Sequence, residues 1–192
     1  MKFCRAAVLV LPLALWVAAA RAGEIPPKIY IDKGACPFEC CTYRDWTVTV
    51  DTALFDKPDG TIQVDTVRKR ETVKGVTGDV YVQPTPFTVA FPHGRFHVGD
   101  TAYLLTYEGE GVSKVWLNGT ISEEEVYFIG DKQDWGYQDG RRVTCMHPTA
   151  QCWGHFEKEN ESDWWVLIKT ARGTQGWTKQ TDHFGNKDAC GG

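Results

Sequence analysis

After its first twenty residues, the sequence lacks any apolar run long enough to span a membrane, and no stretch repeats apolar residues with helical spacing. It also lacks a Cys-x-x-Cys redox pair and the motifs that surround the nucleophile in cysteine peptidases and transpeptidases acting on the cell wall. These absences argue against a membrane-spanning domain, a helical domain and a recognisable enzyme. The sequence therefore predicts a noncatalytic protein.

The N-terminus has the pattern of a secretory signal. Lys2 and Arg5 precede an apolar run that ends in Ala20-Arg21-Ala22, a cleavage site of the Ala-x-Ala type. We predict a signal peptide over residues 1–22, cleaved after Ala22, and a secreted or periplasmic protein. A membrane anchor is the alternative, but Pro12 interrupts a run of about 15 apolar residues where a span needs roughly 20.

Positive charge is scarce in the mature chain. The whole chain of 192 residues has a formal net charge of −4. Loss of Lys2, Arg5 and Arg21 with the signal makes the mature charge −7. An acidic surface disfavours nucleic acid and anionic membranes. We expect neither nucleic-acid binding nor membrane insertion after cleavage, and predict no cofactor.

The cysteines fit an oxidising compartment, because an even number remains in the predicted mature chain. These are Cys36, Cys40, Cys41, Cys145, Cys152 and Cys190. We favour a local Cys145–Cys152 bridge around a short polar loop. A bridge from Cys190 to the N-terminal cluster is plausible, with a local pair such as Cys36 with Cys40 or Cys41. A clamped 145–152 loop that inserts into a partner, as in an inhibitor or assembly factor, is an alternative function.

From Trp46 onward, short alternating segments separated by turn residues predict an all-β fold. The expected strands are 46–50, 61–67, 72–76, 80–82, 101–107, 112–117 and 126–129, followed by a hairpin of 164–169 with 176–178. Turns are expected at 56–60, at 77–79 and at Asn118-Gly119, the strongest hairpin signal. We expect the acidic run 123–125 to be a solvated turn and 131–163 to form long loops.

Two pieces of the chain resemble the SH3-like (SH3b) domains of exported bacterial proteins. Residues 53–60, followed by Arg70-Glu71-Thr72-Val73, resemble the early part of such a domain, with Arg70 in place of a glycine. Residues 164–168 and 173–177 resemble its last hairpin, in which a Trp-x-x-Val strand leads through a turn into Gly-Trp. The resemblance implies a cell-envelope binding or targeting module built on one or two small SH3-like β-barrels.

The domain organisation follows from these pieces. We predict a Cys-rich N-terminal segment at 23–45, a first SH3-like domain at 46–125 and a second at 126–192. The alternative is one barrel that carries a large insertion, because the second matching piece begins more than 100 residues after the start of the first.

Aromatic residues in and beside the loop-rich region are the candidate ligand-binding residues. They are Trp135, Tyr137, Trp153 and Trp164. An outward aromatic ring can stack on a sugar or on a peptide proline. The alternative is that these rings fill the cores. We expect the ligand to be peptidoglycan or an extended peptide of an envelope protein.

The histidines and Cys145 offer the competing chemical functions. His93 and His97 are four residues apart, but Pro92 and Gly94 argue against the helix that would align them, so we predict no metal site. A cell-wall-directed cysteine hydrolase or transpeptidase would use Cys145 with His147 or His155 as base. A free Cys145 would favour that enzyme, whereas a bridge to Cys152 would exclude it.

Overall fold

The computed structural model describes residues 24–126, 136–138, 141–143, 149–150, 152–156, 158 and 160–190, with backbone alone for 136–138 and 141–143. The predicted signal peptide lies outside these residues. The predicted all-β class is confirmed: the described chain consists of strands, loops and one short 3-10 turn, η1 (Thr181–His183). Within this part of the chain, no helix is long and apolar enough to cross a membrane.

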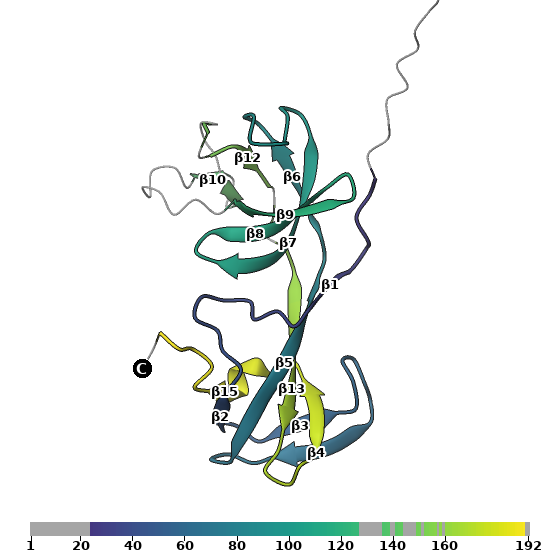
Figure 1. Ribbon diagram of the computed structural model, residues 1–192, viewed down its shortest axis with the longest axis vertical. Coiled ribbons are helices and arrows are strands. Elements are labelled where there is room, and N and C mark those ends of the chain that lie inside the picture. Colours follow the sequence, from purple (N-terminus) through teal and green to yellow (C-terminus); the bar gives the residue numbers. More distant parts are fainter. Residues whose placement is uncertain are drawn as a thin grey trace, which may run out of the picture.

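The larger of the two main sheets has eight strands and curls in the lower half of Figure 1. Its strands are β1 (Tyr30–Lys33), β2 (Asp45–Val48), β3 (Thr52–Phe55), β4 (Gln63–Val67), β5 (Thr72–Val82), β13 (Ser162–Lys169), β14 (Gln175–Thr178) and β15 (Phe184–Gly185). The order is β15-β2-β5-β13-β14-β3-β4, and β1 pairs with the far end of β5. The predicted final hairpin is confirmed as the β13–β14 pair.

The smaller main sheet has five strands and lies in the upper half of Figure 1. Its strands are β6 (Thr85–Val89), β7 (Thr101–Gly109), β8 (Val112–Leu117), β9 (Thr120–Glu125) and β12 (Gly154–His155), in the order β12-β6-β7-β8-β9. A separate two-stranded sheet joins β10 (Gly136–Gln138) to β11 (Arg141–Val143).

The two main sheets do not divide the chain at residue 125. The chain leaves the larger sheet after β5, forms the smaller sheet and returns as β13, which pairs with β5 from Ser162–Val82 to Lys169–Lys74. The predicted boundary between 46–125 and 126–192 therefore separates two strands that share backbone hydrogen bonds. The pairing corresponds instead to the alternative in which one β domain carries a large insertion.

Two local predictions are wrong. The expected turn at 77–79 is part of the continuous strand β5. A Cβ at Gly78 would lie 2.4 Å from Trp164 Nε1 and 2.4 Å from the Tyr43 hydroxyl oxygen, so this glycine makes room for side chains and does not turn the chain. The acidic run 123–125 is not a turn either, because it lies in β9 opposite 112–114 of β8.

The Asn118-Gly119 hairpin is confirmed. Both residues have positive φ, 50° and 81°, and they connect the paired strands β8 and β9. Asparagine and glycine adopt this left-handed conformation at lower cost than other residues, which is why this dipeptide identified the turn.

Each main sheet has its own apolar core. The core of the larger sheet contains Trp46, Val48, Leu54, Val67, Val73, Val166, Ile168 and Phe184. The core of the smaller sheet contains Phe87, Val89, Phe96, Ala102, Leu104, Val115, Leu117, Val126, Cys152, Trp153 and Phe156. Alternating burial along β2 and β6 shows that one face of each strand supplies its core.

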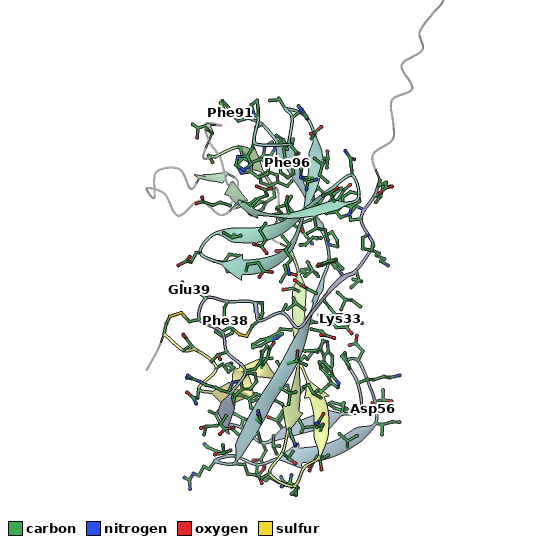
Figure 2. All side chains as sticks on the ribbon, in the orientation of Figure 1. Lys33, Phe38, Glu39, Asp56, Phe91 and Phe96 are labelled. Atoms are coloured by element: carbon green, nitrogen blue, oxygen red, sulfur yellow. A yellow bond between two sulfur atoms is a disulfide. The ribbon has the colours of Figure 1, made fainter. Side chains whose placement is uncertain are left out.

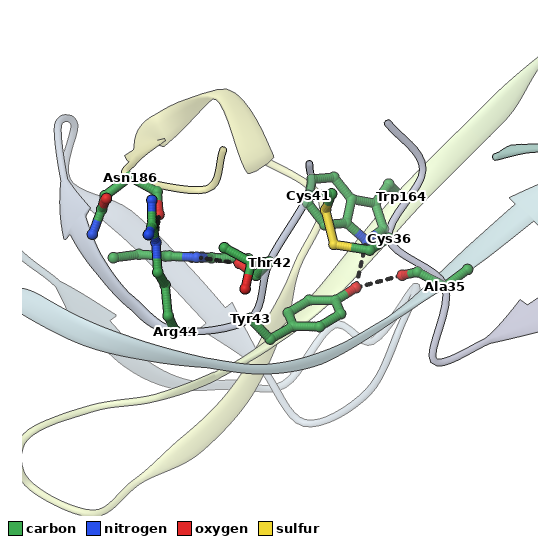
Figure 3. The surroundings of a disulfide bond; sticks show 9 residues. Ala35, Cys36, Cys41, Thr42, Tyr43, Arg44, Trp164 and Asn186 are labelled. Carbon is green, nitrogen blue, oxygen red and sulfur yellow. Dashed lines mark hydrogen bonds between the residues drawn. A yellow bond between two sulfur atoms is a disulfide. The ribbon is translucent and has the colours of Figure 1, made fainter. Parts of the chain in front are cut away.

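One disulfide lies within the N-terminal segment, and a second joins this segment to the C-terminal part of the chain. Cys36 pairs with Cys41, and Cys40 pairs with Cys190 across 150 positions of sequence. Beside the first bridge, the Tyr43 hydroxyl donates to the Ala35 carbonyl oxygen, and Trp164 Nε1 donates to the Tyr43 hydroxyl at 3.2 Å (Figure 3). Burial raises the pKa of Tyr43 to about 12, so the phenol stays protonated at neutral pH.

Polar contacts join the two main sheets. Lys114 Nζ of β8 lies 2.7 Å from the Asp32 carboxylate of β1 and 3.0 Å from the Glu108 carboxylate of β7. The Asn160 amide also donates to the carbonyl oxygen of Leu105. These contacts lie near the point where β5 leads into β6. Residues of both main sheets therefore form the surface at this junction.

Candidate functional site

The edge of β6 is open where the chain passes between the two main sheets. The partner strand β12 covers only Thr88 and Val89. Pro86 lies two residues before Thr88 in the same strand. It has no amide hydrogen to donate, so the backbone cannot extend a β ladder at this residue. Among the described strands, none covers this part of the β6 edge, and a hollow lies beside it.

This first hollow has a volume of about 440 Å³. We call it the proline hollow, and its lining residues are Gln83, Pro84, Thr85, Pro86, Thr88, His155, Phe156 and Lys158. Proline and aromatic groups supply its apolar surface, and threonine, histidine and glutamine supply hydrogen-bonding groups. Concave surfaces with an apolar wall and a few polar groups are typical of ligand sites.

A second hollow of about 270 Å³ adjoins the first, because Gln83 borders both. We call it the acidic hollow, and its lining residues are Ile29, Asp59, Tyr81, Gln83, Glu161, Ser162 and Asp163. Asp59 comes from the turn between β3 and β4, while the other residues come from β5, β13 and the chain beside them. We call the two hollows together the junction groove.

Strand register explains how the acidic hollow forms. Ile31, Tyr81 and Asp163 form one row across β1, β5 and β13, because Tyr81 is paired with both of the others. Residues that are directly opposite in paired strands point to the same face. The row thus lies on the face of the sheet opposite its core, and two of its members, Tyr81 and Asp163, line the acidic hollow.

The acidic hollow contains three carboxylates, and two of them have a lysine partner. Burial raises the pKa of Tyr81, and the nearby carboxylates of Asp79 and Asp59 raise it further. At the rim, Lys158 lies 2.8 Å from Glu161 and lowers the pKa of that carboxyl. Asp59 has no ion-pair partner among the residues that the structure describes.

A lysine of the protein itself lies beside this hollow. The Lys179 ammonium is 5.7 Å from the centroid of the Trp165 ring and 3.4 Å from the Asp163 carboxylate. The combination of an aromatic face and a carboxylate is favourable for a cation. Asp163 belongs to both this pair and the acidic hollow, so the same carboxylate can be approached from the Tyr81 side.

A third hollow, of about 440 Å³, lies at the edge strand β4 around Arg172. The Arg172 guanidinium lies 2.8 Å from Asp65 and 3.3 Å from Glu71. The hydrogen bond from Arg172 lowers the pKa of Asp65, which keeps this carboxyl ionised. This hollow has no proline or aromatic residue in its lining, whereas the junction groove has both, so we regard the junction groove as the stronger candidate site.

The predicted ligand-binding tryptophans that the structure describes pack inside the protein. Trp153 is completely buried; its ring stacks on His93 at 4.5 Å between centroids, and its Nε1 donates to the Glu125 carbonyl at 2.9 Å. Its expected role as an exposed platform is wrong, because the ring has no free face. Trp164 is partly buried and packs against Tyr43 and Trp46 at the core of the larger sheet.

The remaining predicted residues are only partly described. Trp135, Cys145 and His147 lie outside the described residues, and Tyr137 lies in β10, where the backbone alone is described. Cys152 is disulfide-bonded, and Cys36, Cys40, Cys41 and Cys190 pair among themselves, so its partner is none of those four.

His93 and His97, the two histidines with metal-like spacing, contact different acidic residues. His93 Nε2 lies 3.1 Å from Glu124, whereas the exposed His97 lies 3.5 Å from Asp100. His155, the base of the alternative enzyme, belongs to β12 and borders the proline hollow. Among the described residues, the one close group of potential metal ligands is Glu39, Cys40 and Cys190, and both of its sulfur atoms belong to a disulfide.

Sequence reasoning missed the residues that line the junction groove. Pro84 and Pro86 are a local signal for the proline hollow, because proline within a sheet is confined to edge strands and irregular positions. No local signal connects Asp59, Tyr81 and Asp163, because the fold brings them together through the long-range pairing of β5 with β13. Figure 2 shows the side chains on both main sheets and the turn that begins at Asp56.

In comparisons with known proteins, the chain matches no family model, no curated protein and no solved structure.

Proposed function

We propose that this protein is a noncatalytic binding module of the cell envelope, and that its junction groove binds an extended peptide. The ligand is the stem peptide of peptidoglycan or an extended segment of an envelope protein, since both present peptide groups and small side chains. The predicted signal peptide, the paired cysteines and the resemblance to SH3b domains support an exported protein of this kind.

The observation that carries the proposal is the adjacency of two different hollows at Gln83. An extended chain that occupies the proline hollow can continue past this side chain into the acidic hollow. Apolar groups of the ligand would pack on Pro84 and Pro86, while the glutamine, threonine and histidine side chains of the hollow offer hydrogen-bonding groups to it. Peptide recognition of this kind needs no catalytic residue.

Binding of a soluble stem tripeptide, L-Ala-γ-D-Glu-L-Lys, tests the proposal. We would measure its Kd for the secreted protein by calorimetry, and compare variants that fill the groove with a bulky ring. Gln83 and Thr88 are exposed, so Gln83→Trp and Thr88→Trp should leave the fold intact. We expect each to weaken binding about tenfold or more, which corresponds to about 1.4 kcal/mol.

Thr72→Trp is the matched control, because Thr72 is also exposed but lies at the opposite end of β5. It should bind like the unmodified protein. Loss of affinity in both groove variants with normal binding by this control would support the proposal. Equal affinity in all four proteins, or no binding by the unmodified protein at millimolar ligand, would overturn it.

A further inference from the structure

The carboxylates of the acidic hollow favour a particular kind of ligand side chain, in addition to the extended peptide backbone of the proposed function. Its carboxylates come from three places: Asp59 from the β3–β4 turn, Glu161 from the chain before β13, and Asp163 from β13. Its lining contains no lysine or arginine. Tyr81 and Ile29 supply an apolar wall between these charges.

The contacts of Lys179 indicate that an ammonium group fits beside a ring and a carboxylate on this face of the sheet. Its ammonium lies beside the Asp163 carboxylate and over the Trp165 ring, 3.4 Å and 5.7 Å away, respectively. Tyr81 lies directly opposite Asp163 in the paired strand β5 and supplies a second ring beside the same carboxylate. The acidic hollow therefore combines this ring with the Asp163 carboxylate and the Asp59 carboxylate, and its lining contains no lysine or arginine.

We infer that the acidic hollow binds the primary ammonium group of a cationic peptide side chain. The ammonium would lie against the Tyr81 ring, between the Asp59 and Asp163 carboxylates. This inference rests on the proposed function, since it assigns one end of the same groove to the charged side chain of the peptide ligand. It makes the protein selective for peptides with a free amine over peptides in which the amine is acylated.

Charge complementarity favours this occupant over a neutral or acidic one. Asp59 has no ion-pair partner in the described part of the chain, so it gains one when an ammonium enters. An acidic side chain would meet three carboxylates, of which Glu161 and Asp163 already pair with Lys158 and Lys179, and a neutral one would leave Asp59 without a partner. Charge-assisted hydrogen bonds are stronger than neutral ones, which makes the amine the selected feature.

The test compares two probes that differ only at the amine. They are the tripeptide L-Ala-γ-D-Glu-L-Lys and its Nε-acetyl derivative, measured by calorimetry on the secreted protein at low ionic strength. We expect the free amine to bind about tenfold more tightly. The preference should shrink at high salt, because the contact is electrostatic and partly exposed.

Isosteric variants assign the preference to this hollow. Asp59→Asn keeps the shape and is compatible with the positive φ of 53° at that residue. Asp59→Asn and Asp163→Asn should each reduce the preference for the free amine, and Tyr81→Leu should also reduce it. Tyr81→Phe keeps the ring and should retain it. Asp45→Asn, at an exposed aspartate of β2, is the control that should leave it unchanged.

Three outcomes separate this inference from the proposed function. A preference that disappears in the Asp59 and Asp163 variants and survives in the Asp45 variant would support the inference. Equal binding of both probes, with both weakened by Gln83→Trp, would overturn the inference and leave peptide binding in the groove intact. Binding of neither probe, or binding unaffected by the groove variants, would overturn both.

Discussion

Tyr81 and Asp163 lie directly opposite each other in the paired strands β5 and β13. One precedes the segment that forms the smaller main sheet, and the other follows it. Their pairing lies in the middle of the strand order of the larger sheet, between the β2 side and the β14 side, and the segment between β5 and β13 forms the smaller sheet. The junction groove is a direct consequence of this pairing, because residues of both strands line the acidic hollow.

Gly75→Ala should destabilise the protein. A Cβ at this residue would lie 2.8 Å from two ring carbons of Trp46, a fully buried side chain in the core of the larger sheet. Overpacking of this kind costs about 1–3 kcal/mol. Urea denaturation would measure the loss. Lys74→Ala, at the exposed neighbour in β5, is the control and should change stability much less; an equal effect would contradict the packing argument.

Arg70→Gly should stabilise the protein. Arg70 has a φ of 76° and lies exposed in the turn before β5. This left-handed conformation costs a residue with a Cβ roughly 1–2 kcal/mol, a cost that glycine avoids, so we expect a gain of about 1 kcal/mol. Thermal unfolding would detect it as a higher Tm. Lys69→Gly is the matched control, because Lys69 does not have positive φ, and it should give no gain.

Lys114→Met should weaken the contact between the two main sheets. It leaves the buried Asp32 carboxylate without its 2.7 Å partner. Breaking a fully buried pair costs about 3–5 kcal/mol, and because Lys114 is partly exposed we expect about 2 kcal/mol. Arg68→Met, which breaks an exposed pair with Asp51, is the control and should change stability little.

The contribution of Lys114 should also depend on pH. Burial alone would lower the pKa of Lys114, but hydrogen bonds to Asp32 and Glu108 raise it above its ordinary value of 10.5. A pKa that is higher in the folded state gives stability that is fully present below the unfolded pKa and is lost as pH rises through the folded pKa. The stability difference between the unmodified protein and Lys114→Met should therefore be constant near neutral pH and shrink above about pH 10.5. A difference that grows in this range would contradict it.

Disulfide mapping by mass spectrometry under nonreducing conditions should recover a Cys36–Cys41 bridge and a Cys40–Cys190 bridge. Cleavage between the adjacent Cys40 and Cys41, after partial reduction, distinguishes this pairing from the exchanged one. The same experiment tests the predicted Cys145–Cys152 bridge. A free Cys145 would instead favour the cysteine hydrolase.

Local sequence signals predicted those parts of the fold that short segments determine. The β13–β14 hairpin and the Asn118-Gly119 turn follow from patterns within a few residues. Gly78 was misread as a turn, because its function is to leave space for Trp164 and Tyr43, which come from other parts of the chain. The same limit explains Trp153, whose ring is covered by Phe87, His93 and Phe96 from a distant segment.

Strand pairing across the insertion could not be deduced from the sequence. The alternation of apolar residues identifies β5 and β13 as strands but does not state their partners, since many antiparallel registers bury the same faces. The candidate site depends on that choice. Its proline end had a local signal in Pro84 and Pro86, whereas its acidic end had none.

The most direct test of peptide binding in the junction groove is an NMR titration of the isotope-labelled protein with L-Ala-γ-D-Glu-L-Lys. We predict that the largest amide shift changes occur at Tyr81, Gln83, Thr85 and Ser162, where β5, β6 and β13 meet. Changes confined to the hollow around Arg172, or no changes at millimolar peptide, would contradict the account.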